Sequence, residues 1–337
     1  MAGETPIRIS YLIVTRNRAK YLEKTLANVR EFISPADELI IVDGNSTDET
    51  AALIARNRDL VTVFVSEPDR SEGHAVNKAI ARASGRFVKF VTDDDYIYPA
   101  AMIELAKVAD ENPTIDAFQC GGEYWDCQGD VPTFGGYREV RPGSVDTLSP
   151  AEFFWRTHHG LGLMVRRDVL VFVGGASAGY VSVDGDMICK LFEAGCRIAY
   201  LDICLYRWNI FVHSGVLKQA AISRDGVMFD IRLGNWGQAL RQSPAVVASA
   251  LGMPNIPNLE GFLRAVIVLD AIRASRAGWI LNVFFRPIWP IGRAVRKLVR
   301  GSRRKSPASM QDAVAPPSAA GKPFTGALAI LPVRSGR

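Results

Sequence analysis

The sequence lacks the features that mark several large classes of protein. Its five cysteines are odd in number and form no Cys-x-x-Cys pair, so we predict neither a disulfide framework nor a zinc site and expect a reducing, cytoplasmic setting. No run of 18 or more apolar residues occurs, so we predict no membrane-spanning helix. No basic segment followed by an apolar one lies near Met1, so we expect no export signal.

Glycine-rich phosphate-binding signatures are also missing. The first apolar run leads into Thr15-Arg16-Asn17-Arg18, not into G-x-G-x-x-G, and no P-loop occurs, which counts against dinucleotide-binding and P-loop proteins. The formal net charge is +5, yet no helix-turn-helix, zinc-finger or RNP pattern accompanies it, so we predict no nucleic-acid partner. The excess positive charge gathers instead within residues 286–305.

What the chain does contain is a regular alternation of apolar runs and helical patterns. With 337 residues, 48% of them hydrophobic, it is long enough for one large or two modest globular domains. Strands alternating with helices predict an α/β fold with a parallel sheet flanked by helices, whose polar strand exits gather along one edge. The predicted strands are 7–14, 39–42, 61–65 and 87–91, and the helices between them lie at 21–29, from 50 onward and at 73–83.

Three consecutive carboxylates, Asp93-Asp94-Asp95, follow the fourth predicted strand. Clustered oxygen ligands at this edge of a sheet suit Mg²⁺ or Mn²⁺ holding phosphates. A solvated acidic turn is the alternative, because aspartate is a common turn residue, and the triplet alone leaves both interpretations open.

Five segments occur in order along the first hundred residues: Thr15-Arg16-Asn17, Ile41 to Asp48, Glu67-Pro68-Asp69 leading to Asn77-Lys78, Ala83-Ser84-Gly85, and Asp93-Asp94-Asp95 before Pro99. Taken together and in order, these motifs resemble a family 2 glycosyltransferase with the GT-A fold over residues 7 to about 215. The resemblance implies an inverting transfer of a sugar from a nucleotide-sugar donor to a hydroxyl group.

The resemblance also assigns candidate donor-binding residues. Thr15 and Arg16 in the first turn, Asp43 after the second strand and Asp69 would hold the base and ribose. Arg70 or Lys78 would meet the diphosphate, with ordinary solvated charges as the alternative. In the triplet, Asp95 is the expected metal ligand, and Asp93 and Asp94 compete for the ribose or a second ligand position. The cation, Mg²⁺ or Mn²⁺, would neutralise charge on the departing nucleoside diphosphate.

Further candidates lie in the second half of the matching region, where the sequence predicts a helix over 188–194 and a last strand over 197–205. By resemblance, Asp184 is the expected general base and Asp186 the second choice; Val183 departs from the acid that many relatives carry there, and N-cap duty would also select aspartate. His159 is a candidate for the acceptor side or for supporting the site, and His213 for the metal or diphosphate. For each histidine a purely structural role stays open. Tyr124, Trp125, Phe134 and Tyr137 would form either a sugar-stacking platform or, as aromatic residues more commonly do, part of the core.

Beyond about residue 216 the strand pattern gives way to helical segments. Residues 285–300 place apolar groups on one stripe and basic groups on another, which is typical of a helix on an anionic membrane surface or of a packed helix with a solvated basic face. The expected organisation is a catalytic domain over 1–215 (donor half about 7–100, acceptor half about 101–215), a helical extension over 216–300 and a disordered tail over 301–337.

The predicted function is therefore a metal-dependent, hexosyl-type glycosyltransferase in the synthesis of cell-surface polysaccharide or glycolipid. A UDP-sugar is the favoured donor, and a saccharide or lipid-linked molecule is the expected acceptor. The expected location is cytoplasmic, at the inner face of the cell membrane. The alternatives are a sugar nucleotidyltransferase, for which the first turn lacks glycine, and a non-catalytic module that binds nucleotide sugars.

Overall fold

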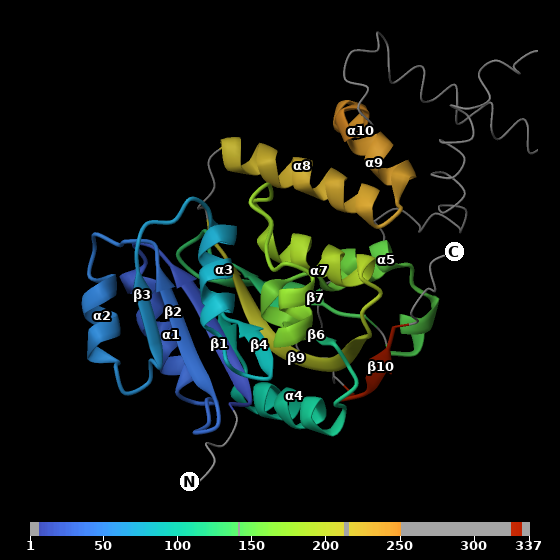
Figure 1. Ribbon diagram of the computed structural model, residues 1–337. Coiled ribbons are helices and arrows are strands. Elements are labelled where there is room, and N and C mark those ends of the chain that lie inside the picture. The colour runs from blue at the N-terminus through green and yellow to red at the C-terminus, as the bar shows by residue number, and fades with distance from the viewer. Residues whose placement is uncertain (1–6, 141, 212–215, 251–324, 332–337) are drawn as a thin grey trace, which may run out of the picture. The chain divides into compact units, whose positions relative to one another are not determined.

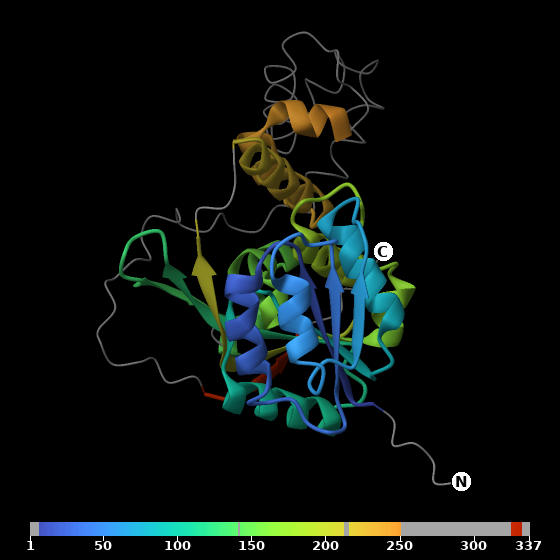
Figure 2. The same cartoon turned by 90° about the vertical axis from the view of Figure 1, so that its left-hand side faces the viewer.

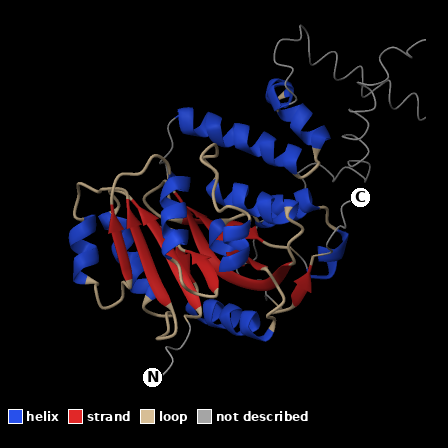
Figure 3. Cartoon of the chain, viewed as in Figure 1, coloured by secondary structure: helices blue, strands red, loops and turns tan. Residues whose placement is uncertain are grey.

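The computed structural model describes residues 7–140, 142–211, 216–250 and 325–331. The chain divides into two compact units, Met1–Lys218 with Pro317–Arg337 and Gln219–Pro316. The first unit is built on a central sheet flanked by helices (Figure 1, Figure 3). In its described part the strand order is β10-β9-β6-β8-β4-β1-β2-β3, with β5 paired to β9 and β7 paired to β6.

The first half of this sheet is parallel, as predicted. Strand β1 pairs with β2 on one side and with β4 on the other, and β2 pairs with β3. All six residues of β2 are buried, as expected for a strand covered on both faces. Helices α1 and α2 pack beside one another (Figure 2). The elements are β1 (Ile9–Thr15), α1 (Ala19–Val29), β2 (Glu38–Asp43), α2 (Thr50–Arg56), β3 (Val63–Ser66), α3 (Glu72–Arg82) and β4 (Phe87–Phe90).

The second half of the sheet is mixed, so the prediction of a mostly parallel sheet holds only for the first half. Strand β8 is antiparallel to both β4 and β6, whereas β6 and β9 are parallel. The elements are β5 (Tyr96–Ile97), α4 (Pro99–Glu111), β6 (Ala117–Asp126), β7 (Thr133–Arg138), η1 (Pro142–Thr147), α5 (Pro150–Thr157), η2 (Gly160–Gly162), β8 (Leu163–Arg166), α6 (Arg167–Phe172), α7 (Val183–Glu193) and β9 (Ile198–Ile210).

Two boundaries in this half differ from the sequence prediction in ways that matter for the site. Helix α7 begins at Val183, five residues before the predicted start at Ile188, so Asp184 lies in its first turn. Acidic residues are favourable there because they face the positive end of the helix dipole. Strand β9 continues to Ile210, past the predicted end at Leu205, because it pairs with β6 along its length.

A third difference concerns the predicted disordered tail. Its residues Leu328–Ile330 form strand β10, which pairs antiparallel with β9 at the edge of the sheet. The prediction is wrong for this segment, because its backbone groups find partners on β9 that local composition does not reveal. The other residues beyond Ser302, apart from 325–331, lie outside the described residues.

The described part of the second unit is helical, as the sequence predicts. It comprises most of α8 (Val216–Arg232) together with α9 (Trp236–Gln242) and α10 (Pro244–Ala250). Val227, Ala239 and Val247 form a small apolar core. The predicted amphipathic segment 285–300 lies outside the described residues. Within the part of the chain that is described, no helix combines the length and apolar character that crossing a membrane requires.

Candidate active site

A cavity of about 660 Å³ opens at the carboxyl edge of the parallel strands. Ligand sites in open α/β sheets lie at this edge, and the volume falls in the range of small-ligand pockets. The predicted site residues that line it are Thr15, Arg16, Asp69, Arg70, Asp93, Asp95, His159 and Asp184. The predicted residues Asp43, Lys78, Asp94 and Asp186 lie outside its lining, and His213 lies outside the described residues.

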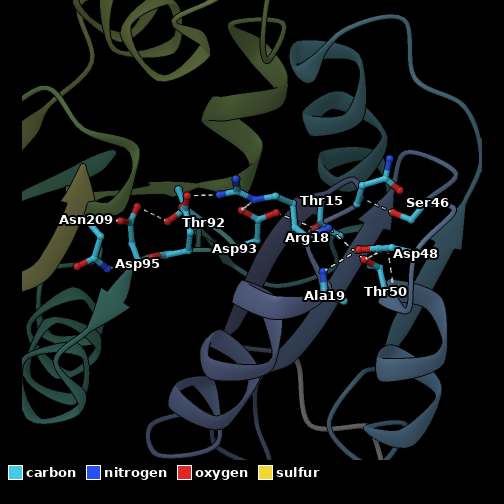
Figure 4. Close-up of polar contacts among 12 residues, drawn as sticks. Thr15, Arg18, Ala19, Ser46, Asp48, Thr50, Thr92, Asp93, Asp95 and Asn209 are labelled. Atoms are coloured by element: carbon cyan, nitrogen blue, oxygen red, sulfur yellow. Dashed lines mark hydrogen bonds and ion pairs between the residues drawn. The ribbon is translucent and has the colours of Figure 1, made fainter. Parts of the chain in front are cut away.

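Asp95 is the most deeply placed acid of the triplet, with 9% of its surface exposed. Its Oδ1 accepts a hydrogen bond from the backbone N–H of Asn209 (2.7 Å), and its Oδ2 accepts one from Thr92 Oγ1 (2.6 Å) (Figure 4). Burial, together with the neighbouring carboxylates, raises the pKa of Asp95 to about 8. The carboxyl group is thus held by β9, a strand more than a hundred residues away, and faces the cavity.

Asp93 and Asp94 are held together by Arg18, which the sequence analysis did not select for the site. Arg18 Nε donates to Asp93 Oδ1 (3.3 Å), and its Nη2 forms an ion pair with Asp94. Asp93 Oδ2 also accepts from Thr15 Oγ1 (2.7 Å), and burial raises the pKa of Asp93. Its position in the turn after β1, two residues beyond the selected Arg16, could have identified Arg18 as a site residue from the sequence. Because Arg18 also lines the cavity, it puts a fixed positive charge beside the acids.

The two turns that follow β1 and β2 are tied to each other. Asn17 adopts the left-handed conformation (φ 54°), donates its backbone N–H to Ser46 Oγ (2.8 Å) and accepts from the backbone N–H of Thr47 (2.8 Å). Asp48 accepts from Ala19 N (3.2 Å), which Figure 4 places beside Thr50. These bonds explain why the Thr-Arg-Asn-Arg and Asn-Ser-Thr-Asp segments occur together: each supplies partners for the other's backbone.

Asp43 and Asp69 occupy different environments although both were expected to bind the nucleoside. Asp43 is fully buried and does not line the cavity, and its carboxylate accepts from the backbone N–H of Ser46 (3.1 Å) and from Ser66 Oγ (2.6 Å). Asp69 lines the cavity and pairs with Lys78 Nζ (2.7 Å). Lys78, in helix α3, also pairs with Glu67 (3.0 Å), so its charge is neutralised by two acids of the preceding loop.

Asp184 lies in the cavity wall at the start of α7. Its Oδ2 accepts from the backbone N–H of Gly160 (3.0 Å), and its Oδ1 accepts from its neighbour's backbone N–H at Gly185 (2.8 Å). Burial alone would raise its pKa, but the adjacent histidines and these two N–H groups hold the pKa below its ordinary value. The side chain is therefore an ionised carboxylate at neutral pH that faces the cavity.

Asp186, the second-choice base, has a structural role. It is fully buried, accepts from the backbone N–H of Ser177 (2.7 Å) and pairs with Lys190 Nζ (3.4 Å) one turn further along α7. These contacts anchor the loop that precedes the helix.

His159 stands between Asp184 and the aromatic residues of β9. Its ring stacks on Tyr206 (centroids 5.0 Å apart, 18° between planes) and lies 5.0 Å from the ring of Trp208. Burial lowers the pKa of His159, while the adjacent Asp184 carboxylate acts in the opposite direction. The Nδ1 of His159 accepts from the backbone N–H of Leu161 (3.3 Å), so this bond and the aromatic neighbours hold the ring in the cavity wall.

Asp93 and Asp95 are the two acids of the triplet that line the cavity and could hold a divalent cation there. Hard oxygen ligands of this kind suit Mg²⁺ or Mn²⁺, which bind proteins through one or two carboxylates and take other ligands from phosphates and water. Among the described residues, no group of three or more His, Cys, Asp or Glu side chains is arranged around one point. The residues thus fit a cation that is shared with a phosphate-bearing ligand, not one enclosed by protein alone.

One motif of the resemblance lies away from the cavity and is structural. The buried Glu38 carboxylate accepts from the backbone N–H groups of Ser84 (2.7 Å) and Gly85 (3.2 Å) and from Ser10 Oγ (2.5 Å). A Cβ on Gly85 would lie 2.6 Å from the backbone nitrogen of Ser10. The Ala-Ser-Gly segment therefore locks the end of α3 onto β1 and β2.

Comparison with known proteins gives a family match and a set of distant relatives. Residues 10–149 match the family model described as glycosyl transferase family 2. The poly(ribitol-phosphate) beta-N-acetylglucosaminyltransferase TarS of Staphylococcus aureus is 30% identical over 111 residues, which are 32% of this chain and 19% of that protein. The GalNAc(5)-diNAcBac-PP-undecaprenol beta-1,3-glucosyltransferase of Campylobacter jejuni is 29% identical over 109 residues, 31% of this chain and 35% of that protein. The chain thus spans about a fifth to a third of the length of these curated relatives.

The solved structures agree in fold. S. aureus TarS 1-349 in complex with UDP aligns with a TM-score of 0.52 at 18% identity, covering 88% of this chain and 89% of that one. The complex of the same fragment with UDP-GlcNAc aligns with a TM-score of 0.51 at 18% identity and the same coverage. The predicted GT-A fold is confirmed.

Proposed function

We propose that this chain, whose residues 10–149 match the model of glycosyl transferase family 2, transfers a hexosyl-type sugar from a nucleotide-sugar donor to an acceptor hydroxyl group with inversion. The observation that carries the proposal is that an ionised, hydrogen-bonded Asp184 lines the same cavity as Asp93 and Asp95. A single displacement needs two groups in the same cavity: a base for the attacking hydroxyl group and an anchor for the departing diphosphate.

The donor is proposed to bind along the turns after β1 and β3. Thr15, Arg16 and Asp69 line this part of the cavity, and Gly44 permits close approach, since a Cβ there would lie 3.1 Å from both Arg16 Cδ and Asp69 Oδ2. Asp43 would act by fixing the turn at Ser46. The similar structures of S. aureus TarS are complexes with UDP and with UDP-GlcNAc, and on that similarity we propose a UDP-sugar donor for this chain.

Arg18 and Arg70 are proposed to meet the diphosphate, because each lines the cavity and a guanidinium group matches phosphate oxygens in a bidentate way. Lys78 is not given this role, because it does not line the cavity and its charge is taken up by Glu67 and Asp69. Asp95, with Asp93, would hold Mg²⁺ or Mn²⁺. Such a cation would neutralise charge that develops on the diphosphate.

Asp184 is proposed to accept the proton of the acceptor hydroxyl group. The freed oxygen attacks the anomeric carbon from the side opposite the diphosphate, the new C–O bond forms, and the bond to the phosphate oxygen breaks with its electron pair left on the nucleoside diphosphate. One displacement inverts the anomeric configuration. Gly160 N–H and Gly185 N–H keep the carboxylate oriented during this step.

A saccharide or lipid-linked acceptor is proposed from the relatives. Their names specify poly(ribitol-phosphate) for S. aureus TarS and a PP-undecaprenol compound for the C. jejuni enzyme. By the same similarity we propose a role in cell-surface polysaccharide or glycolipid synthesis, at the inner face of the cell membrane.

The deciding experiment compares the wild-type chain with D184N and D186N. UDP release from a panel of UDP-sugars and UDP binding are both measured with Mn²⁺ or Mg²⁺. We expect D184N to lose transfer by about 10²–10⁴-fold, as for removal of a general base, and to keep UDP binding. D186N is expected to lose stability with residual transfer. Release of pyrophosphate instead of a nucleoside diphosphate would favour the nucleotidyltransferase alternative, and UDP binding with no transfer in the wild type would favour a binding module.

A further inference from the structure

Arg138 lies beside Trp208, a residue of the cavity lining, and has no counter-ion among the residues that the structure describes. It ends strand β7, and its guanidinium lies over the ring of Trp208, 5.1 Å from the centroid. Its Nε is buried and has no hydrogen-bond partner, and among residues 7–140, 142–211, 216–250 and 325–331 no carboxylate lies within ion-pair distance of it. Leaving a buried donor and a charge unpaired costs free energy, so such a group is retained where a ligand supplies the partner.

The neighbours of Arg138 connect it to the proposed base. Trp208 lines the cavity, and its ring lies 5.0 Å from that of His159, which directly precedes the Gly160 that donates to Asp184. Arg138 is also close enough to the two histidines at 158 and 159 to lower the pKa of each, in addition to the larger effect of burial. A group bound at Arg138 would therefore lie along the wall that leads to the attacking hydroxyl group.

A second orphan donor lies in the same row of the sheet. Gly122 pairs with Arg138 on β7 and with Tyr206 on β9. The buried hydroxyl group of Tyr206 has no hydrogen-bond partner among the described residues. Two unsatisfied donors, one of them cationic, in one row beside an aromatic face suit an oxyanion next to a sugar ring.

We propose that Arg138 and Trp208 form an acceptor subsite for an anionic glycan: a phosphate or carboxylate group of the acceptor pairs with the Arg138 guanidinium while an adjacent sugar or polyol lies against Trp208. The inference that the bound glycan is an acceptor rests on the proposed transferase function. The existence of an anion site beside Trp208 does not depend on that function.

The test uses the full chain with its donor site filled by UDP, so that anionic probes do not bind there. The chain has six tryptophans, and the indole N–H signal of Trp208 is assigned by its absence in W208F. Glycerol 3-phosphate and glucuronate are the anionic probes, and glycerol and glucose are their neutral counterparts. The phosphate and carboxylate arms separate the two sources of the anion.

We expect the Trp208 signal to shift with at least one anionic probe and not with its neutral counterpart. R138Q should weaken that binding roughly tenfold or more, because a charge-assisted pair is lost. R86Q is the matched control, since Arg86 also lies over an aromatic ring (4.9 Å from the Phe87 centroid) but is exposed and remote from the cavity lining. Thermal unfolding of R138Q should occur at or above the wild-type temperature, because the variant loses no ion pair within the described residues and no longer carries the unpaired charge.

Equal shifts with charged and neutral probes, no shift with any probe, or unchanged binding in R138Q would each overturn the inference. If the Trp208 response follows the prediction while no sugar transfer occurs with any donor, the anion site stands and the proposed function fails. If transfer occurs and R138Q leaves both the response and the KM for acidic acceptors unchanged, the function stands and the subsite fails.

Discussion

Lys89 offers a test that links the stability of the sheet to the geometry of the site. It lies in the central strand β4, is completely buried and has no carboxylate within ion-pair distance among the described residues. Its ammonium group donates to the backbone carbonyls of Phe90 (3.1 Å) and of Leu161. Burial lowers the pKa of Lys89 to about 7.

This pKa fixes the sign and size of a pH effect. The unfolded lysine keeps its proton up to about pH 10.5, whereas the folded one loses it above about pH 7. Between these values the unfolded state binds more protons, so the free energy of unfolding rises with pH. A pKa that falls from 10.5 to about 7 means that the fold disfavours the charged form of Lys89 by about 5 kcal/mol. Deprotonation removes part of this cost, so the free energy of unfolding rises by about 2 kcal/mol between pH 7 and pH 9.

The variant K89M removes the charge while keeping an unbranched side chain. Relative to wild type, we expect its free energy of unfolding to be higher at pH 7, by a few kcal/mol after about 1–2 kcal/mol is subtracted for the lost hydrogen bonds. The advantage should shrink by about 2 kcal/mol at pH 9. Urea unfolding at the two pH values measures both quantities, with K107M, a change at an exposed lysine of α4, as the control.

K89M should also slow the proposed transfer although it stabilises the fold. Lys89 holds the carbonyl of Leu161, and the adjacent Gly160 N–H holds Asp184, so the turn η2 is free to shift once the ammonium group is gone. A displaced base lowers kcat by roughly tenfold or more. Two results would refute this account: a K89M protein that is less stable than wild type at pH 7, or a stability difference that is the same at both pH values. Either would show that the buried ammonium group does not destabilise the fold.

Two further predictions concern the sheet and the donor site. Gly122→Ala would bring a Cβ to 2.4 Å from the ring of the buried Tyr206, so we expect the free energy of unfolding in urea to fall by about 1–3 kcal/mol. Gly129→Ala, where the nearest atom is 4.0 Å away, should change that free energy little. Equal effects of the two variants would count against the packing account. Arg18→Gln removes the charge that holds Asp93 and Asp94 together, so the affinity for UDP, measured by calorimetry, should weaken roughly tenfold or more. The control Arg30→Gln, which breaks an exposed ion pair with Asp59, should leave the UDP affinity unchanged. Wild-type UDP affinity in R18Q would exclude Arg18 from the diphosphate site.

The sequence alone determined the first half of the sheet and the chemical types at its edge. Apolar runs that end in polar turns are local patterns, and the carboxyl ends of parallel strands must meet, so Thr15, Asp69 and Asp93 could be assigned to one cavity before the fold was known. The preference for Asp184 over Asp186 as the candidate base also came from the sequence, through the resemblance, and it remains a prediction.

Only the tertiary structure decided how these groups are held and which are free to act. The hydrogen bond from Asn209 to Asp95 joins residues 114 apart, and the contact of Arg18 with Asp93 joins residues 75 apart. Neither is encoded in a local pattern, because both depend on the path of β9 and on the order of strands. The same holds for Lys78, which is neutralised by Glu67 and Asp69, and for Arg138, which lies beside Trp208 with no ion-pair partner among the described residues. Local periodicity specifies which face of a strand is apolar, but the partner of a charge is set by which distant strand packs beside it.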